Sequence, residues 1–157
     1  MIQPSSSPSS AAALPAEASD AVQAALGAEH AAVWVYGLVS AFLPAGLDAP
    51  VAAGMAAHRA RRDATERFLA AAGSTPRPAE PAYLPPDPVT DQASALALLV
   101  TAEADTTVAW RAVLERTDSA ELRAAALEAL TTAAVRAARW RKAAGQSPVT
   151  PALPGQP

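Results

Sequence analysis

Cysteine is absent from this chain of 157 residues, so disulfides, thiolate metal sites and cysteine nucleophiles are all excluded. Long apolar runs are absent too: the most apolar stretch, residues 31–43, is shorter than the ~20 residues of a spanning helix and is followed by Pro44. The N-terminus lacks the basic and long apolar segments of a secretory signal. These absences predict a cytoplasmic protein with no membrane partner.

Catalytic signatures are equally scarce. The chain has only two histidines, His30 and His58, and contains no Glu-x-x-His pair, Gly-rich phosphate loop or Ser-His-Asp order. The sequence therefore leans against an enzyme without excluding one. A net charge of -3 does not indicate a polyanionic partner, and acidic Asp63 and Glu66 follow the arginines at 59–62. Nucleic acid is therefore not an expected partner.

Four long segments carry apolar residues at the spacing of amphipathic helices, and none shows strand alternation. We therefore expect an all-α fold. The expected helix starts are Ser19–Asp20, Asp48–Pro50, Asp91 and Asp118, the last with the capping-box spacing to Glu121. The expected ends are Phe42, Gly73, Thr117 and Gly145.

The links between these segments predict the topology. The first and last links are short, which makes each pair of helices an antiparallel hairpin. The middle link, residues 74–90, is rich in proline, and in extended polyproline geometry it would reach ~40–50 Å at ~3.1 Å per residue. A helix of about 25 residues is ~38 Å long. A crossover along the whole bundle is therefore expected, with a floppy linker as the alternative.

The remaining segments define the expected domain boundaries. Residues 1–18 are expected to be a disordered lead-in, and residues 19–145 a single four-helix bundle. Residues 146–157 form a proline-rich tail that has no core to join. The tryptophans Trp34, Trp110 and Trp140 have the helical spacing of core or interface anchors.

A polar group stands near the middle of each inward helical face. Following the 4-3-4-3 spacing along each segment gives stripes that are apolar except at mid-height, and His30 sits beside the first stripe. The expected inward polar cluster is Glu29, His30, His58, Arg62, Glu103 and Arg136. A shift of one residue in the register would bring Arg61 or Ala137 inward instead.

These residues resemble those of ferritin-like di-metal proteins, which place one Glu on each of two helices and Glu-x-x-His on each of the other two. Glu29 and Glu103 match the two single carboxylates, each on the first helix of its hairpin. The paired motifs do not match: residues 55–58 read MAAH, which keeps only His58, and residues 133–136 read AAVR, which keeps neither ligand. The resemblance thus implies the ferritin-like fold with a degenerate di-metal site.

Three runs carry a narrower resemblance: GAEHAAVWVYG at 27–37, HRARRD at 58–63 and RAARW at 136–140. They are similar to an uncharacterised ferritin-like family of high-GC bacteria whose function is unassigned. This resemblance implies the four-helix bundle with two hairpins and a crossover, and it makes a homodimer an expectation. It implies no activity.

Three interpretations of the polar cluster stay open. Arginine never ligates metals, so Glu29–Arg62 and Glu103–Arg136 ion pairs around His58 could be a purely structural lock. A vestigial site for Fe, Mn or Zn would use candidates among Glu29, His30, His58 and Glu103. The third interpretation is a pocket that orients a polar or anionic small ligand.

We therefore predict a non-catalytic binding or interaction module, with an unidentified small ligand or protein partner and no cofactor. The alternative is an atypical carboxylate/His metal-binding protein, either an oxidase or a metal-storage protein.

Overall fold

The computed structural model describes residues 13–156, and within that range it contains four long helices and no strand. The helices are α1 (Ala16–Val39), α2 (Asp48–Ala71), α3 (Gln92–Glu115) and α4 (Ala120–Ala143). Two 3-10 turns, η1 (Ser40–Phe42) and η2 (Ala45–Leu47), connect α1 to α2. The prediction of an all-helical chain with four helices is confirmed. The expected lead-in lies outside the described residues for positions 1–12.

Two predicted helix starts are wrong by a few residues. Helix α1 begins directly after Pro15 rather than at Ser19–Asp20, because the fixed φ of proline suits a helix entrance and the added turn buries Ala18. Helix α4 is capped by Ser119, whose Oγ accepts the backbone N–H of Leu122 at 3.3 Å. Glu121 is then only two residues after the cap, one position too early to complete a capping box with Ser119.

The start of α3 agrees with its expected cap. Asp91 Oδ1 accepts the backbone N–H of Ser94 at 2.8 Å, and the hydroxyl of Ser94 accepts the N–H of Asp91, which completes a capping box. At the end of α2, Gly73 has a φ of +77°, the left-handed conformation that ends a helix without steric cost.

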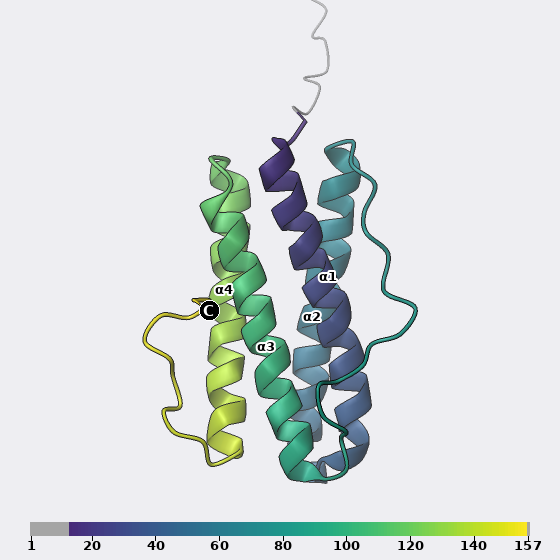
Figure 1. Ribbon diagram of the computed structural model, residues 1–157, viewed down its shortest axis with the longest axis vertical. Coiled ribbons are helices and arrows are strands. Elements are labelled where there is room, and N and C mark those ends of the chain that lie inside the picture. The colour runs from purple at the N-terminus through teal and green to yellow at the C-terminus, as the bar shows by residue number, and fades with distance from the viewer. Residues whose placement is uncertain (1–12, 157) are drawn as a thin grey trace, which may run out of the picture.

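The four helices lie at the corners of a square, and three of its four sides are closely packed. Helix α1 packs against α2 and α3, and α3 packs against α4. Figure 1 shows α1 and α3 in front, with α2 and α4 behind them. The fourth side, between α2 and α4, is the least closely packed, and a cleft lies there.

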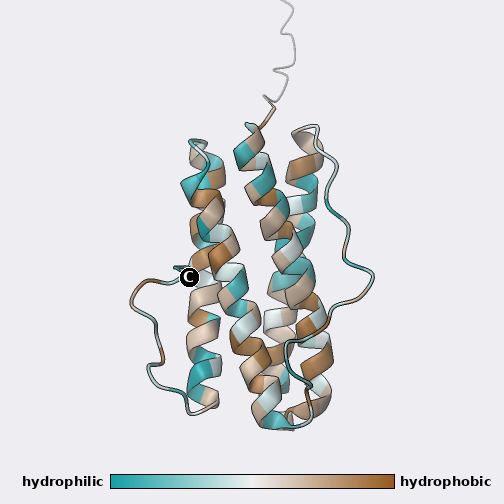
Figure 2. Ribbon diagram, viewed as in Figure 1, coloured by the Kyte–Doolittle hydropathy of each residue, from teal (hydrophilic) through white to brown (hydrophobic). Residues whose placement is uncertain are grey.

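The core consists of two apolar clusters. The first contains Leu26, Leu69, Trp110 and Val113 among its members, and the second contains Tyr36, Val51, Leu96, Leu99 and Trp140. Hydrophobic residues, brown in Figure 2, gather at the lower ends of α1 and α3, where the second cluster lies. Buried polar side chains separate the two clusters at mid-height.

The segment from residue 74 to residue 90 runs along the outside of the bundle beside α1, from the upper end of α2 to the lower end of α3 (Figure 1). Its backbone is tied to α1 by Gln23, which donates to the carbonyl of Thr75 and accepts the N–H of Arg77, both at 2.8 Å. Further along, the ring of Tyr83 packs against Trp34 at a centroid distance of 5.7 Å. Helices α2 and α3 are consequently parallel.

The C-terminal tail lies close to the bundle. Residues 146–156 fold back beside α3 and α4 (Figure 1), and Gly155 approaches the backbone of Thr107 and the side chain of Arg111 closely. Together with α3 and α4, tail residues including Val149 and Leu153 line a hollow of about 520 Å³. Val149 and Leu153 are 37% and 58% exposed, and none of residues 146–156 is buried, so the tail contributes no residue to the two core clusters.

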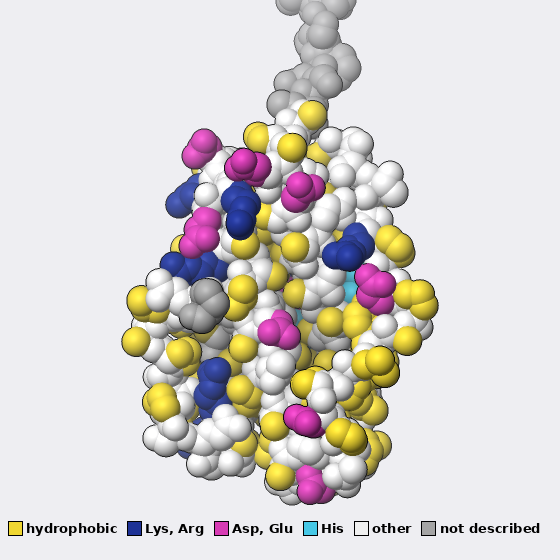
Figure 3. All heavy atoms as spheres, viewed as in Figure 1, with side chains coloured by type: hydrophobic (Ala, Val, Ile, Leu, Met, Phe, Trp, Pro, Cys, Tyr) yellow, Lys and Arg dark blue, Asp and Glu magenta, His cyan; other side chains and the backbone are white. Residues whose placement is uncertain are grey.

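Charged side chains of both signs are interspersed on the face seen in Figure 3. None of the helices in the described range combines the length and the apolar character that crossing a bilayer requires.

Candidate functional site

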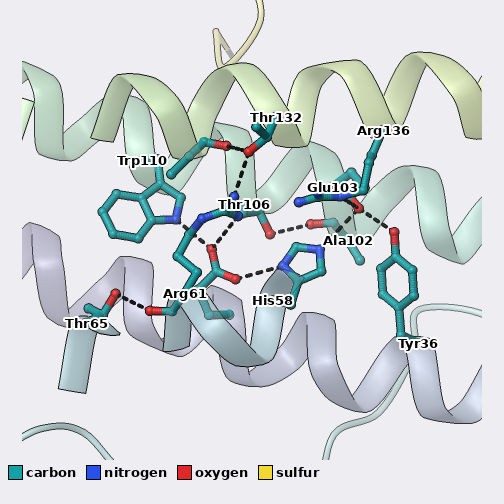
Figure 4. Close-up of polar contacts among 12 residues, drawn as sticks. Tyr36, His58, Arg61, Thr65, Ala102, Glu103, Thr106, Trp110, Thr132 and Arg136 are labelled. Atoms are coloured by element: carbon teal, nitrogen blue, oxygen red, sulfur yellow. Dashed lines mark hydrogen bonds and ion pairs between the residues drawn. The ribbon is translucent and has the colours of Figure 1, made fainter. Parts of the chain in front are cut away.

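Glu29 of α1, His58 of α2 and Glu103 of α3 meet at the centre of the bundle, and all three are fully buried. His58 bridges the two carboxylates: Nδ1 lies 2.7 Å from Glu29 Oε2, and Nε2 lies 3.1 Å from Glu103 Oε1. Figure 4 shows the imidazole between α1 and α3. The apolar stripes of three helices therefore converge on one His-carboxylate bridge.

Each carboxylate also faces its own arginine. Arg61 Nη1 donates to Glu29 Oε1 at 3.2 Å, and Arg136 Nε donates to Glu103 Oε1 at 2.8 Å. The two arginine side chains are only 13% and 16% exposed, so these ion pairs are poorly screened by solvent. The negative charges of the two buried carboxylates are thus compensated by one arginine of α2 and one arginine of α4.

Aromatic side chains supply the remaining donors. Trp110 Nε1 donates to Glu29 Oε1 at 2.7 Å, and the hydroxyl of Tyr36 donates to Glu103 Oε1 at 2.5 Å. Trp140 Nε1 in turn donates to the Tyr36 oxygen at 2.9 Å. Burial and the adjacent Glu103 carboxylate raise the pKa of Tyr36 far above its ordinary range, so its hydroxyl keeps its proton.

The partners of His58 determine its protonation. Burial alone would lower the pKa of His58, but hydrogen bonds and charge from Glu103 and Glu29 outweigh it and raise that pKa. Burial would raise the pKa of Glu29, but the hydrogen bond and charge of His58 and the charge of Arg61 lower it overall. With each ring nitrogen facing a carboxylate oxygen, this geometry and the raised pKa favour the imidazolium form of His58, in which both nitrogens donate.

The cluster therefore brings two carboxylates together with Arg61, Arg136 and His58. With His58 protonated and both carboxylates ionised, its formal charge is one positive unit. Two buried atoms of the Glu103–Arg136 pair have no hydrogen-bond partner within the described part of the chain, Glu103 Oε2 and Arg136 Nη2. This arrangement is a compact cationic site rather than a carboxylate-rich one.

Two residues of the expected cluster lie elsewhere. Arg62 points away from Glu29, and its Nε donates to Asp63 Oδ1 at 2.8 Å. The register of α2 is shifted by one residue, about 100° around the helix, which brings Arg61 inward instead. His30 faces the outside of α1, where its Nε2 lies 3.2 Å from the carbonyl of Arg77 and 3.5 Å from Glu66. His30 therefore contacts the linker of residues 74–90 and is not part of the polar cluster at the centre of the bundle.

The predicted cluster does not include several residues of the site. Tyr36, Trp110 and Trp140 all fall on the inward stripes, where they count as apolar residues. Tyr36 and Trp110 donate to the buried carboxylates, and Trp140 donates to Tyr36. Thr132 accepts a hydrogen bond from Arg61 Nη2 at 2.6 Å. The signal that could have identified the aromatic donors is the demand of two buried carboxylates for hydrogen bonds.

The neighbouring arginines of α2 provide a matched test of this register. We expect Arg61→Gln to lower the free energy of unfolding by about 1–3 kcal/mol, because it removes charged hydrogen bonds to Glu29 and Thr132. Arg62→Gln should change it by less than about 0.5 kcal/mol, because its pair with Asp63 is at the surface. Chemical denaturation of both variants measures the difference, and equal effects would contradict the register.

Gly54 makes room for the aromatic donor Tyr36. A Cβ at Gly54 would overlap the Tyr36 ring, which is fully buried. We expect Gly54→Ala to cost about 1–3 kcal/mol of stability through overpacking, although alanine is the better helix former. The control is Gly37→Ala in α1, where a Cβ meets nothing within 4 Å, and thermal melting should show no loss of stability there.

A cleft opens beside the cluster, between α2 and α4. Its volume is about 550 Å³, and four alanines, Trp110 and Val22 are among the residues lining it. Arg61, Thr132 and Arg136 also line it, so the two arginines of the cluster reach the wall of the cleft, whereas His58 stays fully buried. The size falls within the ~300–1,000 Å³ range of small-molecule pockets.

The candidate metal ligands do not form a metal-binding group. Across residues 13–156, no set of three or more His, Cys, Asp or Glu side chains is arranged to hold a metal ion. Glu29, His58 and Glu103 do come together, but they are bonded to one another, and His30 is turned away from them.

The family described as a domain of unknown function, DUF4439, matches residues 21–157, which is most of the chain and all four helices after the first turn of α1. The chain belongs to the DUF4439 family. This DUF4439 chain is also similar to a conserved hypothetical protein of Mycobacterium tuberculosis known from a crystal structure. The two are 40% identical with a TM-score of 0.79, over 83% of this chain and 99% of that one. No curated protein matches this DUF4439 chain.

Proposed function

We propose that this DUF4439 domain is a non-catalytic binding module with a ferritin-like fold, in which a His-Arg-Glu network stands where ferritin-like proteins hold two metal ions. One observation carries the proposal: His58 lies between Glu29 and Glu103, with each ring nitrogen within hydrogen-bond distance of one carboxylate. The two carboxylates that match the ferritin-like pattern are therefore used for ion pairing.

The ferritin-like part of the proposal is supported by the order of the elements. Two antiparallel hairpins, α1–α2 and α3–α4, are joined by a long segment that makes α2 and α3 parallel (Figure 1). One long crossover is the connection found in ferritin-like bundles. Glu29 and Glu103 lie on the first helix of each hairpin, as single carboxylates do in that fold.

The residues do not fit a di-metal centre. Both nitrogens of His58 face carboxylates, so neither offers the lone pair that a metal needs. Arg61 and Arg136 are permanently charged, cannot ligate and would repel a dication. The second and fourth helices lack the carboxylates of the paired motifs.

Binding is supported by the cleft between α2 and α4, which exposes the cationic side of the network. A purely structural lock would not need an opening to its charged groups, whereas a ligand site would. The homodimer and the cytoplasmic location stay predictions.

The second candidate is an atypical Fe, Mn or Zn protein. It is favoured by the meeting of two carboxylates and an imidazole from three helices within hydrogen-bond distance. Metal binding there would require His58 to lose a proton and turn from donor to ligand.

Elemental analysis distinguishes the two candidates. The purified protein is measured as isolated and after anaerobic loading with Fe(II), Mn(II) or Zn(II), beside Glu29→Ala and the surface control Glu128→Gln. We expect less than about a tenth of an equivalent of metal in all three proteins. One equivalent or more in the wild type and in Glu128→Gln, lost in Glu29→Ala, would establish the metalloprotein instead.

A further inference from the structure

The cleft between α2 and α4 is long and is apolar over much of its length. Ala57, Ala60 and Ala64 of α2 line one side and Ala125 of α4 lines the other. Along α4 the lining runs from Glu121 to Arg136, about 22 Å at ~1.5 Å per residue. Small side chains on two facing helices leave a channel for an elongated group rather than a broad pocket.

One end of the cleft is cationic. Arg61 and Arg136 reach the lining from opposite helices, and Thr132, one turn before Arg136 on α4, accepts a hydrogen bond from Arg61 Nη2. Arg136 Nη2 is buried and has no acceptor among the described residues. Guanidinium N–H groups are good donors to a carboxylate or a phosphate, and Arg136 keeps Nη2 for such a partner while its Nε is bonded to Glu103.

The rest of the cleft limits the charge of an occupant. Glu121 and Glu128 are exposed on the α4 wall, so a second anionic group away from the arginine end would meet carboxylates. Leu122, Phe68 and Trp110 form apolar surface along the same stretch. The cleft is therefore complementary to a molecule with one anionic end and an apolar body.

We propose that the cleft binds a single-chain amphiphile with one oxyanion head group, whose head lies at Arg61, Thr132 and Arg136 and whose apolar body lies along the alanine walls. This inference rests on the proposed function, because it gives the binding module its ligand class. It also assigns Arg136 two roles, as the ion-pair partner of Glu103 and as the head-group donor.

Titration calorimetry with decanoate and with decyl phosphate, each below its micelle concentration, tests the inference. Acetate, inorganic phosphate and decyltrimethylammonium serve as probes that lack the body or reverse the charge. We expect saturable 1:1 binding of at least one alkyl anion, at least tenfold tighter than acetate or phosphate and than the alkyl cation. The tighter alkyl anion identifies the head group. Absence of saturable binding, or equal binding of the cation, would overturn the inference.

Two alanines of α2 give a matched pair of variants. Ala60 lines the cleft, whereas Ala56 is equally exposed one turn away and lies outside it. Leucine favours a helix nearly as well as alanine, so both variants should fold. Ala60→Leu should weaken binding of the alkyl anion at least tenfold and Ala56→Leu by less than twofold, whereas equal affinities in the two variants would contradict a site in the cleft.

The metal content of the same preparations separates failure of the proposed ligand class from failure of the proposed function. Failure of alkyl-anion binding in metal-free protein overturns the ligand class and leaves the non-metal module standing. Stoichiometric metal overturns the proposed function, whatever the titration shows.

Discussion

Glu29→Gln should lower the free energy of unfolding by about 3–5 kcal/mol, the usual cost of removing one partner from a buried ion pair. Glu29 is fully buried and accepts hydrogen bonds from His58, Arg61 and Trp110. Glutamine keeps the shape but removes the charge that compensates His58 and Arg61. Urea denaturation followed by far-ultraviolet circular dichroism measures the loss.

The control for this prediction is Glu128→Gln, an exposed position on α4 that should change stability by less than about 0.5 kcal/mol. A Glu29→Gln loss below about 1 kcal/mol would mean that Glu29 is not ionised against two cations in the folded protein.

Stability should pass through a maximum in weakly acidic solution. The folded-state pKa of His58 is raised above its unfolded value of 6.5, so its contribution is complete below pH 6.5 and is lost as pH rises through the folded pKa. The folded-state pKa of Glu29 is lowered below 4.5, so its contribution is complete above pH 4.5 and is lost as pH falls through the folded pKa. Both contributions are complete only between these values.

Urea denaturation at a series of pH values measures this profile. In His58→Gln the fall on the alkaline side should disappear, although this variant is less stable throughout. The same alkaline slope in wild type and variant would assign it to another group, and a wild-type stability that rises from pH 6.5 to 9 would contradict a charged His58.

The helices could be predicted because their apolar spacing and terminal residues agree. Asp91 and Gly73 mark the start of α3 and the end of α2 where the sequence indicates them. The starts of α1 and α4 were harder to predict, because neighbouring residues compete for the same role. Ser119 can cap a helix as well as Asp118 can, and α1 begins directly after Pro15, before Ser19 can act as its cap. The path of the tail beside α3 and α4 depends on the surface of those two helices, which no local pattern in the tail shows.

The carboxylates of the site could be predicted from the sequence, whereas their hydrogen-bond and ion-pair partners were harder to predict. Glu29, His58 and Glu103 interrupt apolar stripes, and a charge in such a stripe must be buried with compensation. Which arginine of α2 provides it depends on a rotation of about 100°, and both Arg61 and Arg62 fall near the edge of the stripe. The cleft depends on how far apart α2 and α4 stand, which the sequence of neither helix specifies.

The most direct measurement of the central claim is the ¹⁵N NMR spectrum of the His58 ring, assigned by comparison with His58→Gln. The account predicts that both ring nitrogens carry protons at pH 7.5, with shifts typical of an imidazolium, and that one equivalent of Zn(II) or anaerobic Fe(II) leaves them unchanged. A neutral ring at that pH, or a His58 nitrogen that shifts stoichiometrically on metal addition, would contradict the claim that this network has replaced a metal site.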